Sequence, residues 1–181
     1  MGLVWILVHL IGFDINELIG ALITPLLSAS SNSLLGVLTF VLLTVFMWIF
    51  GIHPAILATI MTPVWLINAD ANMLAAKAGE AIPNIGVQPF FFTFLWIGGG
   101  GGTRALCCLM CFSKSKFLKQ LGRLSILPGL FNINEPLLFG LPIVLNPILG
   151  IPFLIAPVIN TFITYFAFTS GLVPGMGYPL A

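Results

Sequence analysis

The sequence predicts an all-α membrane protein in which transmembrane helices are combined with re-entrant or broken helical hairpins. Hydrophobic residues make up 59% of the 181 residues and charged residues only 6%, against roughly 25% charged residues in soluble domains. The mean hydropathy is +1.15, which indicates a chain embedded in a bilayer. Prolines and glycines interrupt the apolar runs. Broken backbone at membrane depth is tolerated only where protein or a water-filled cavity surrounds it.

The first part of the chain contains the clearest predicted helix. Residues 2–11 are apolar but too short to span a bilayer, since a spanning helix needs about 20 residues. Residues 14–27 begin with acidic side chains, which a helix N-terminus favours, and residues 28–33 indicate a polar turn. Residues 34–50 contain no charge and predict a helix. This helix ends at Gly51-Ile52-His53-Pro54, a first break that carries a polar group.

The middle of the chain predicts an uneven topology. Residues 55–67 are apolar, but Pro63 predicts an interruption of the helix. Residues 68–84 indicate a polar excursion with a short helix. Residues 90–112 are long enough to span, although glycines occupy positions 98–102. No Gly-Lys-Ser/Thr follows these glycines, so they are not a phosphate loop, and close helix packing or a hinge is the expected use.

The basic residues indicate an orientation. Five of the six Lys and Arg residues fall between Arg104 and Arg123. The positive-inside rule therefore predicts a cytoplasmic basic loop at residues 112–124, and a polybasic lipid-binding patch is an alternative compatible with the same topology. Arg104 faces either a cavity or the cytoplasmic end. Residues 143–172 contain three prolines, and their last part is expected to be a spanning helix.

The candidate site lies at Asn132-Ile133-Asn134-Glu135-Pro136. A charge at bilayer depth costs about 2.5–3.5 kcal/mol, so Glu135 is expected to face a cavity, a substrate or a partner. Pro136 and Pro142 exclude one continuous helix there. Interrupted apolar segments build the binding sites of many transporters, and this chain has two, at His53 and at Glu135.

The residue types at these two breaks suit carbohydrate. Glu135 accepts hydrogen bonds, His53 donates or accepts according to its tautomer, and Asn132 and Asn134 do both. Sugar hydroxyls need that mixture, together with an aromatic face for the C–H surface of the ring. Trp48, Trp65 and Trp96 are candidates for that face, although tryptophan at the membrane interface is the alternative explanation.

Other function classes find no support. The net charge is +1 and no basic, aromatic-rich surface suggests nucleic acid. Cys107, Cys108 and Cys111 lie in one apolar segment with no nearby His or carboxylate, so neither a metal site nor a cofactor is expected.

The run from Pro128 to Pro147, which reads PGLFNINEPLLFGLPIVLNP, closely resembles the membrane (IIC) subunit of the bacterial phosphoenolpyruvate:sugar phosphotransferase system, in its lactose/cellobiose/diacetylchitobiose branch. Three further segments resemble this family in the same order. They are Trp48-Ile49-Phe50-Gly51-Ile52-His53, Ile82-Pro83-Asn84-Ile85 and Ser113-Lys114-Ser115-Lys116.

The resemblance implies a multi-pass permease of the bacterial inner membrane that binds a β-linked disaccharide and carries it inward. A partner IIB subunit, itself supplied through IIA and HPr, would then transfer phosphate from its cysteine to a sugar hydroxyl. The chain would not be a catalyst alone. Glu135 and His53 match the residues taken to contact that hydroxyl, Asn134 would add a hydrogen bond, and Asn132 is a further candidate. Members of the family are expected to be homodimers.

Family members are more than twice as long, so residues 1–181 are expected to be a partial IIC transmembrane domain. Two alternatives stay open from the sequence. One is an ion-coupled secondary transporter that uses Glu135 as a proton or cation site. The other is an inactive, truncated remnant whose polar residues are inherited without a role.

Overall fold

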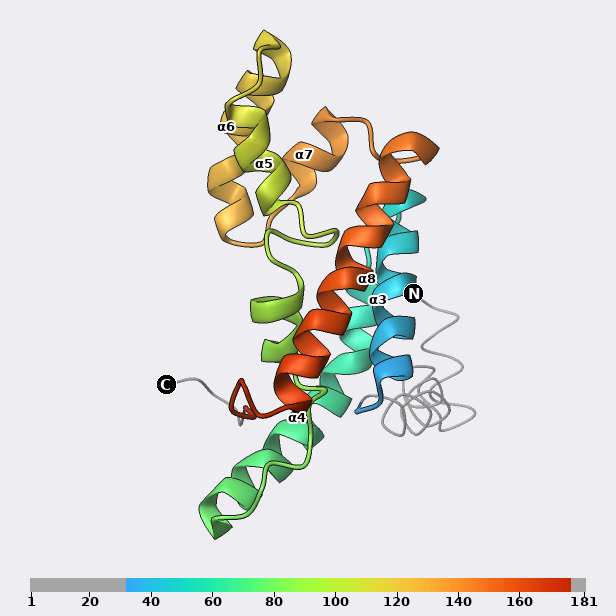
Figure 1. Ribbon diagram of the computed structural model, residues 1–181. Coiled ribbons are helices and arrows are strands. Elements are labelled where there is room, and N and C mark those ends of the chain that lie inside the picture. Colours follow the sequence, from blue (N-terminus) through green and yellow to red (C-terminus); the bar gives the residue numbers. More distant parts are fainter. Residues whose placement is uncertain (1–31, 177–181) are drawn as a thin grey trace, which may run out of the picture.

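The computed structural model describes residues 32–176, so the predictions for earlier segments lie outside the described residues. Within this range the chain forms α-helices and one π-helical turn, without strands. In chain order the elements are α3 (Leu34–Ile49), α4 (Ala55–Ala78), η1 (Phe90–Leu95), α5 (Arg104–Cys111), α6 (Lys116–Leu130), α7 (Glu135–Gly140) and α8 (Pro147–Thr169). α3 and α8 lie side by side, and α5, α6 and α7 gather at one end of the molecule (Figure 1).

The predicted helix at residues 34–50 is confirmed as α3. The hydroxyl of Ser33 caps its N-terminus by accepting a hydrogen bond from the Gly36 amide at 3.0 Å. The chain leaves the helix at Gly51, whose φ of +74° belongs to the left-handed region that glycine adopts without strain. His53 and Pro54 then lead directly into α4.

The helix α4 is longer than predicted, because it passes through Pro63 and continues to Ala78. The asparagines of the expected polar excursion lie on its buried face. Asn68 donates to the Gly86 carbonyl at 2.7 Å, and Asn72 donates to the Asn84 carbonyl at 2.8 Å. These bonds satisfy the amides against the returning chain, so the polar residues continue the helix instead of ending it.

The predicted span at residues 90–112 is wrong as one continuous helix. It divides into η1, a glycine loop at residues 98–102 and the short helix α5. Gly98, Gly99, Gly101 and Gly102 have φ values of +92°, +92°, +93° and +64°, which a right-handed helix excludes. The glycines therefore turn the chain within the expected span.

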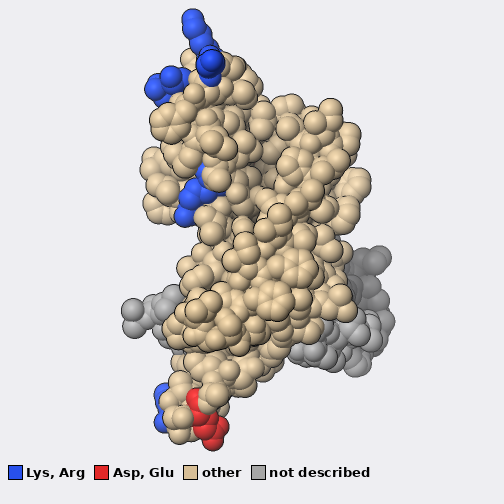
Figure 2. All heavy atoms as spheres, viewed as in Figure 1, with Lys and Arg blue, Asp and Glu red and all other residues tan. Residues whose placement is uncertain are grey.

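The predicted basic loop at residues 112–124 is mostly helical. Only residues 112–115 connect α5 to α6, and Ser115 caps α6 by accepting from the Leu118 amide. Lys116, Lys119 and Arg123 therefore lie on the helix. Lys and Arg side chains gather at the end of the molecule that contains α6 (Figure 2). Basic and acidic side chains both lie at the opposite end, at the tip of α4. Most of the surface seen between these ends is uncharged. The cytoplasmic placement of the basic end stays a prediction.

Pro136 limits α7 as expected, and the apolar helix expected within residues 143–172 is present as α8. α7 begins at Glu135 with Pro136 in its first turn, where a proline removes no helical hydrogen bond. α8 continues through Pro152 and Pro157. Among the described residues, α8 is the one helix that is long and apolar enough to cross a membrane.

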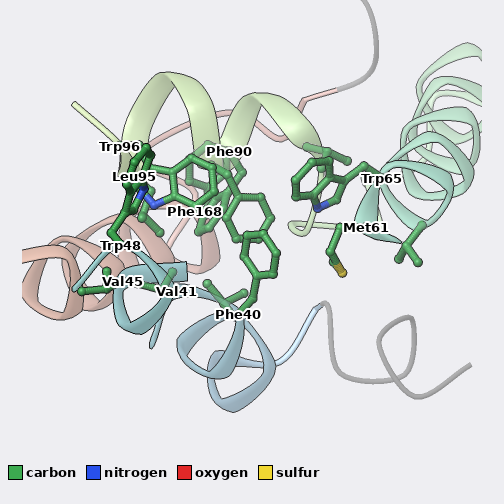
Figure 3. Packing of buried hydrophobic residues seen from close by; sticks show 14 of the residues in the cluster. Phe40, Val41, Val45, Trp48, Met61, Trp65, Phe90, Leu95, Trp96 and Phe168 are labelled. Carbon is green, nitrogen blue, oxygen red and sulfur yellow. The ribbon is translucent and has the colours of Figure 1, made fainter. Parts of the chain in front are cut away.

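The core joins α3, α4, η1 and α8 through aromatic side chains. The ring of Phe40 on α3 packs edge-on against Trp65 of α4 and Phe91 of η1, with centroids 5.6 and 5.0 Å apart. Phe168 of α8 contacts Phe90 at 5.4 Å (Figure 3). Such pairs prefer edge-to-face geometry, and their buried area holds the π-helical turn against the bundle.

Candidate functional site

The two polar groups predicted from the sequence face one another. His53 lies in the link between α3 and α4, and Glu135 is the first residue of α7. The Nε2 atom of His53 lies 3.4 Å from Oε1 of Glu135. The side chains are 58% and 38% exposed, so both can be reached by a ligand.

The local structure of the link determines which nitrogen of His53 carries the proton. The Ala55 amide donates a hydrogen bond to Nδ1 of His53 at 3.2 Å, so Nδ1 is an acceptor. In the neutral imidazole the proton is therefore assigned to Nε2, the atom that faces Glu135. Trp48 holds the ring from the side, with centroids 4.7 Å apart and planes at 68°.

The two carboxylate oxygens of Glu135 have different surroundings, since Oε1 faces His53. Its Oε2 atom is buried and has no hydrogen-bond partner among residues 32–176. An unpaired buried carboxylate oxygen is costly. Because Oε2 is buried, a ligand can reach Glu135 only through the exposed part of its side chain. Glu135 also stands at the N-terminus of α7, where the free backbone amides favour a negative charge.

Both residues open into a cavity of about 340 Å³. Its lining residues come from α3, the His53 link, α4, η1, the glycine loop and the segment before α7. They are Phe40, Thr44, Trp48, His53, Pro54, Ala55, Ala58, Phe92, Trp96, Gly99, Gly100, Asn132, Asn134 and Glu135. The volume lies within the range of roughly 300–1,000 Å³ typical of small-molecule sites. The structure thus brings all four predicted site residues to one cavity.

The two asparagines hold the cavity wall with their side chains. Asn132 accepts from the Gly98 amide at 3.0 Å and donates to the Phe92 carbonyl at 2.7 Å. Asn134, which is 3% exposed, donates to the Gly100 carbonyl. This bond uses one of the two N–H donors of Asn134, and its side-chain oxygen is an acceptor for a ligand hydroxyl.

The three candidate tryptophans lie in different places, and their contact with sugar stays a prediction. Trp48 and Trp96 line the cavity, whereas Trp65 packs in the core against Phe40 and Phe91 and does not. Sequence reasoning missed Phe92 as a lining residue. The unbroken phenylalanine run at positions 90–92 is a signal for a packed aromatic turn, but it does not tell which ring faces a cavity.

Sequence reasoning also missed the glycine loop as part of the site. Gly99 and Gly100 line the cavity, and a Cβ atom on Gly100 would lie 2.5 Å from Nε1 of Trp48. The glycine run was visible in the sequence. Its place against the asparagine motif depends on the tertiary fold.

Arg104, whose placement the sequence left open, is not among the lining residues of this cavity. Its Nη2 atom donates to the Leu130 carbonyl at 3.2 Å and to the Gly129 carbonyl at 3.5 Å, at the C-terminus of α6. A cation there complements the helix dipole. Within residues 32–176 no three His, Cys, Asp or Glu side chains group as a metal site.

Broken helices around a mostly apolar cavity that carries His53, Glu135 and two asparagines are the arrangement found at the binding sites of helical membrane proteins. A model of the family described as "Phosphotransferase system, EIIC" matches residues 1–157. The chain therefore belongs to the EIIC family of the phosphotransferase system. The resemblance drawn from the sequence is confirmed.

Several curated proteins of this family are similar to the chain. The putative permease IIC component YwbA of Bacillus subtilis is 45% identical over 94% of this chain and 40% of its own length. The lichenan permease IIC component of the same organism is 41% identical over 88% of this chain and 36% of its own length. A cellobiose-specific EIIC component of Geobacillus stearothermophilus is 39% identical over 87% of this chain and 36% of its own length.

A solved structure confirms the fold class. The crystal structure of the transporter ChbC, the IIC component of an N,N'-diacetylchitobiose-specific phosphotransferase system, matches with a TM-score of 0.79 and 42% identity. The match covers 96% of this chain and 40% of that chain. The chain thus spans about 40% of the length of these relatives.

Proposed function

We propose that this chain forms the sugar-binding part of a β-glycoside permease of the phosphotransferase system. His53 and Glu135, 3.4 Å apart in a cavity with tryptophan walls, carry the proposal. The relatives named above supply the sugar class, which is a β-linked disaccharide of the cellobiose, lactose or N,N'-diacetylchitobiose type. The location proposed for the protein is the bacterial inner membrane, with several spans.

The proposed chemistry begins with one sugar hydroxyl between the two side chains. The hydroxyl donates to the exposed side of the Glu135 carboxylate, and Nε2–H of His53 holds Oε1 of that carboxylate in place. Asn134 accepts from a neighbouring hydroxyl, and the faces of Trp48 and Trp96 cover the C–H surface of the sugar. Asn132 lines the same cavity.

The partner is a IIB subunit that carries a phosphocysteine and is itself supplied through IIA and HPr. The sugar hydroxyl oxygen forms the new bond to phosphorus, the phosphorus–sulfur bond of the partner breaks, and the hydroxyl proton passes to Glu135. A carboxylate in hydrogen-bond reach of the attacking hydroxyl supplies orientation and general-base catalysis. Two lactose-specific relatives bear the name EIICB component, which agrees with such a partnership. A homodimer is the proposed assembly of the full-length protein.

The test measures binding of cellobiose, lactose and N,N'-diacetylchitobiose to the chain in lipid nanodiscs by calorimetry. Glu135→Gln and His53→Ala should each weaken binding of the preferred sugar by roughly 10- to 100-fold, because a polar group that the bound sugar covers loses its partner. Glu80→Gln is the matched control, since Glu80 is exposed and follows the far tip of α4.

Each outcome separates the candidate functions. Binding that is lost in both variants and retained in the control supports the sugar site. Absence of binding to the folded chain would support the inactive remnant. Addition of a phosphorylated IIB protein then tests the transfer step. An ion-coupled transporter would yield no sugar phosphate and would bind sugar in proportion to the proton or sodium concentration.

A further inference from the structure

The side chain of Asn132 connects two separate parts of the cavity wall. Its carbonyl oxygen accepts from the Gly98 amide at 3.0 Å, and its amide nitrogen donates to the Phe92 carbonyl at 2.7 Å. Asn132 itself has a φ of +61°, a left-handed conformation that asparagine tolerates better than most residues. The side chain therefore bridges η1 and the glycine loop.

The glycine loop fits tightly against the same motif. A Cβ atom on Gly99 would lie 2.7 Å from Cγ of Asn134 and 2.9 Å from the carbonyl oxygen of Asn132. Asn134 also donates to the Gly100 carbonyl. Three successive glycines, 98 to 100, thus meet the two asparagines at close range.

The segments that Asn132 bridges carry several residues of the cavity wall. Phe92 of η1, Trp96 at its end, and Gly99 and Gly100 of the loop all line the cavity. A run of five glycines has many accessible conformations, so the loop has no fixed shape without outside contacts. The hydrogen bonds of Asn132 join the start of the loop to the turn that carries the aromatic rings.

We propose that Asn132 is a positioning residue, which sets the aromatic and glycine wall of the sugar site through the loop. The inference rests on the proposed function and deepens it. The contribution of Asn132 to sugar recognition is indirect. It holds Phe92 and Trp96 in register with Glu135 and thereby pre-organises the site.

A second side chain holds the same loop from outside the cavity. The buried hydroxyl of Thr103 donates to the Gly98 carbonyl at 2.6 Å, and Thr103 is not among the residues that line the sugar cavity. Thr103→Val removes this bond with little change in shape. If Asn132 acts on sugar binding through the glycine loop, Thr103→Val must weaken sugar binding, as a change at Asn132 does.

The experiment combines sugar binding with a readout of the empty site. The chain is labelled with 5-fluorotryptophan at its four tryptophans, and the Trp96 ¹⁹F resonance is assigned with Trp96→Phe. Asn132→Gly keeps the left-handed backbone accessible and removes the bridging amide. Spectra are recorded without sugar, and affinities are measured for cellobiose, lactose and N,N'-diacetylchitobiose.

Asn132→Gly and Thr103→Val should both shift or broaden the Trp96 resonance in the absence of sugar. Both should weaken the binding of all sugars that the wild-type chain binds by a similar factor, roughly tenfold or more. Asn146→Ala is the control for lost stability alone. Asn146 caps α8 by accepting from the Ile148 and Leu149 amides and does not line the cavity.

A direct sugar contact predicts a different pattern, which would overturn the proposal. In that case Asn132→Gly leaves the sugar-free Trp96 resonance unchanged and weakens only those sugars that carry the contacted group, while Thr103→Val has no effect. Unchanged affinity in Asn132→Gly would also overturn it. Failure of the proposed function appears separately, as absence of binding to the wild-type chain, and the sugar-free spectra still test the positioning.

Discussion

His53 and Glu135 meet across 3.4 Å, although His53 follows α3 and Glu135 begins α7. The Ala55 amide occupies Nδ1 of His53, so the Nε2–H group faces the carboxylate. The ring therefore presents a donor in a fixed direction. The role of His53 as a hydrogen-bond donor can therefore be tested separately from its size and charge.

We expect His53→Gln to retain more sugar affinity than His53→Ala. The terminal amide of glutamine can place a donor near the position of Nε2, whereas alanine leaves Oε1 of Glu135 without its neighbour. The glutamine variant should bind within about tenfold of the wild type, and the alanine variant should bind more weakly still. Calorimetry with the preferred disaccharide measures the difference. Equal losses in the two variants would show that the donor is not what matters.

Gly99→Ala should destabilise the chain and abolish sugar binding. At this position the φ of +92° is strained for alanine, and the added Cβ would also lie 2.7 Å from Cγ of Asn134. Gly79→Ala is the matched control, because Gly79 has a φ of +73° with nothing within 4 Å. In the control the added backbone strain should lower the free energy of unfolding by about 1–2 kcal/mol, and the sugar affinity should stay unchanged. Thermal unfolding measures the loss of stability, and calorimetry measures the loss of sugar affinity. Similar results in both variants would show that the close approach of Gly99 to Asn134 is not needed for binding.

Arg104→Met should lower stability without changing sugar affinity. The guanidinium group donates to the carbonyls of Leu130 and Gly129 at the end of α6, and it does not line the cavity. Loss of a charged partner for these carbonyls should cost about 1–2 kcal/mol in thermal unfolding. Lys114→Gln, at an exposed position before α6, should have no measurable effect. A loss of affinity in Arg104→Met at unchanged stability would assign Arg104 to the site.

The basic end of the molecule should lie on the cytoplasmic side. In a chain whose native cysteines are replaced, Lys114→Cys should react with a membrane-impermeant maleimide in inside-out vesicles only. Glu80→Cys, beyond the far tip of α4, should react in right-side-out vesicles only. The positive-inside rule supplies the reason, since Lys114 belongs to the cluster of basic residues and Glu80 does not. The reverse labelling pattern would overturn the orientation.

Local pattern predicted the elements where neighbouring residues alone decide the structure. The uncharged run that became α3 and the polar breaks at His53 and at Glu135-Pro136 all follow from propensity and from the geometry of proline. The extent of α4 did not follow. Its polar second half packs against the returning chain, whose backbone carbonyls accept from Asn68 and Asn72.

The sequence by itself determined the class of this protein, the two breaks and the polar residues that stand at them, because burial cost and helix geometry are local properties. Only the tertiary structure decided that the glycine loop divides the expected span and becomes a wall of the cavity. It also decided that Trp96 lines the cavity while Trp65 remains in the core, and that Asn132 holds backbone groups. These outcomes depend on contacts between segments far apart in the chain, which no local pattern encodes.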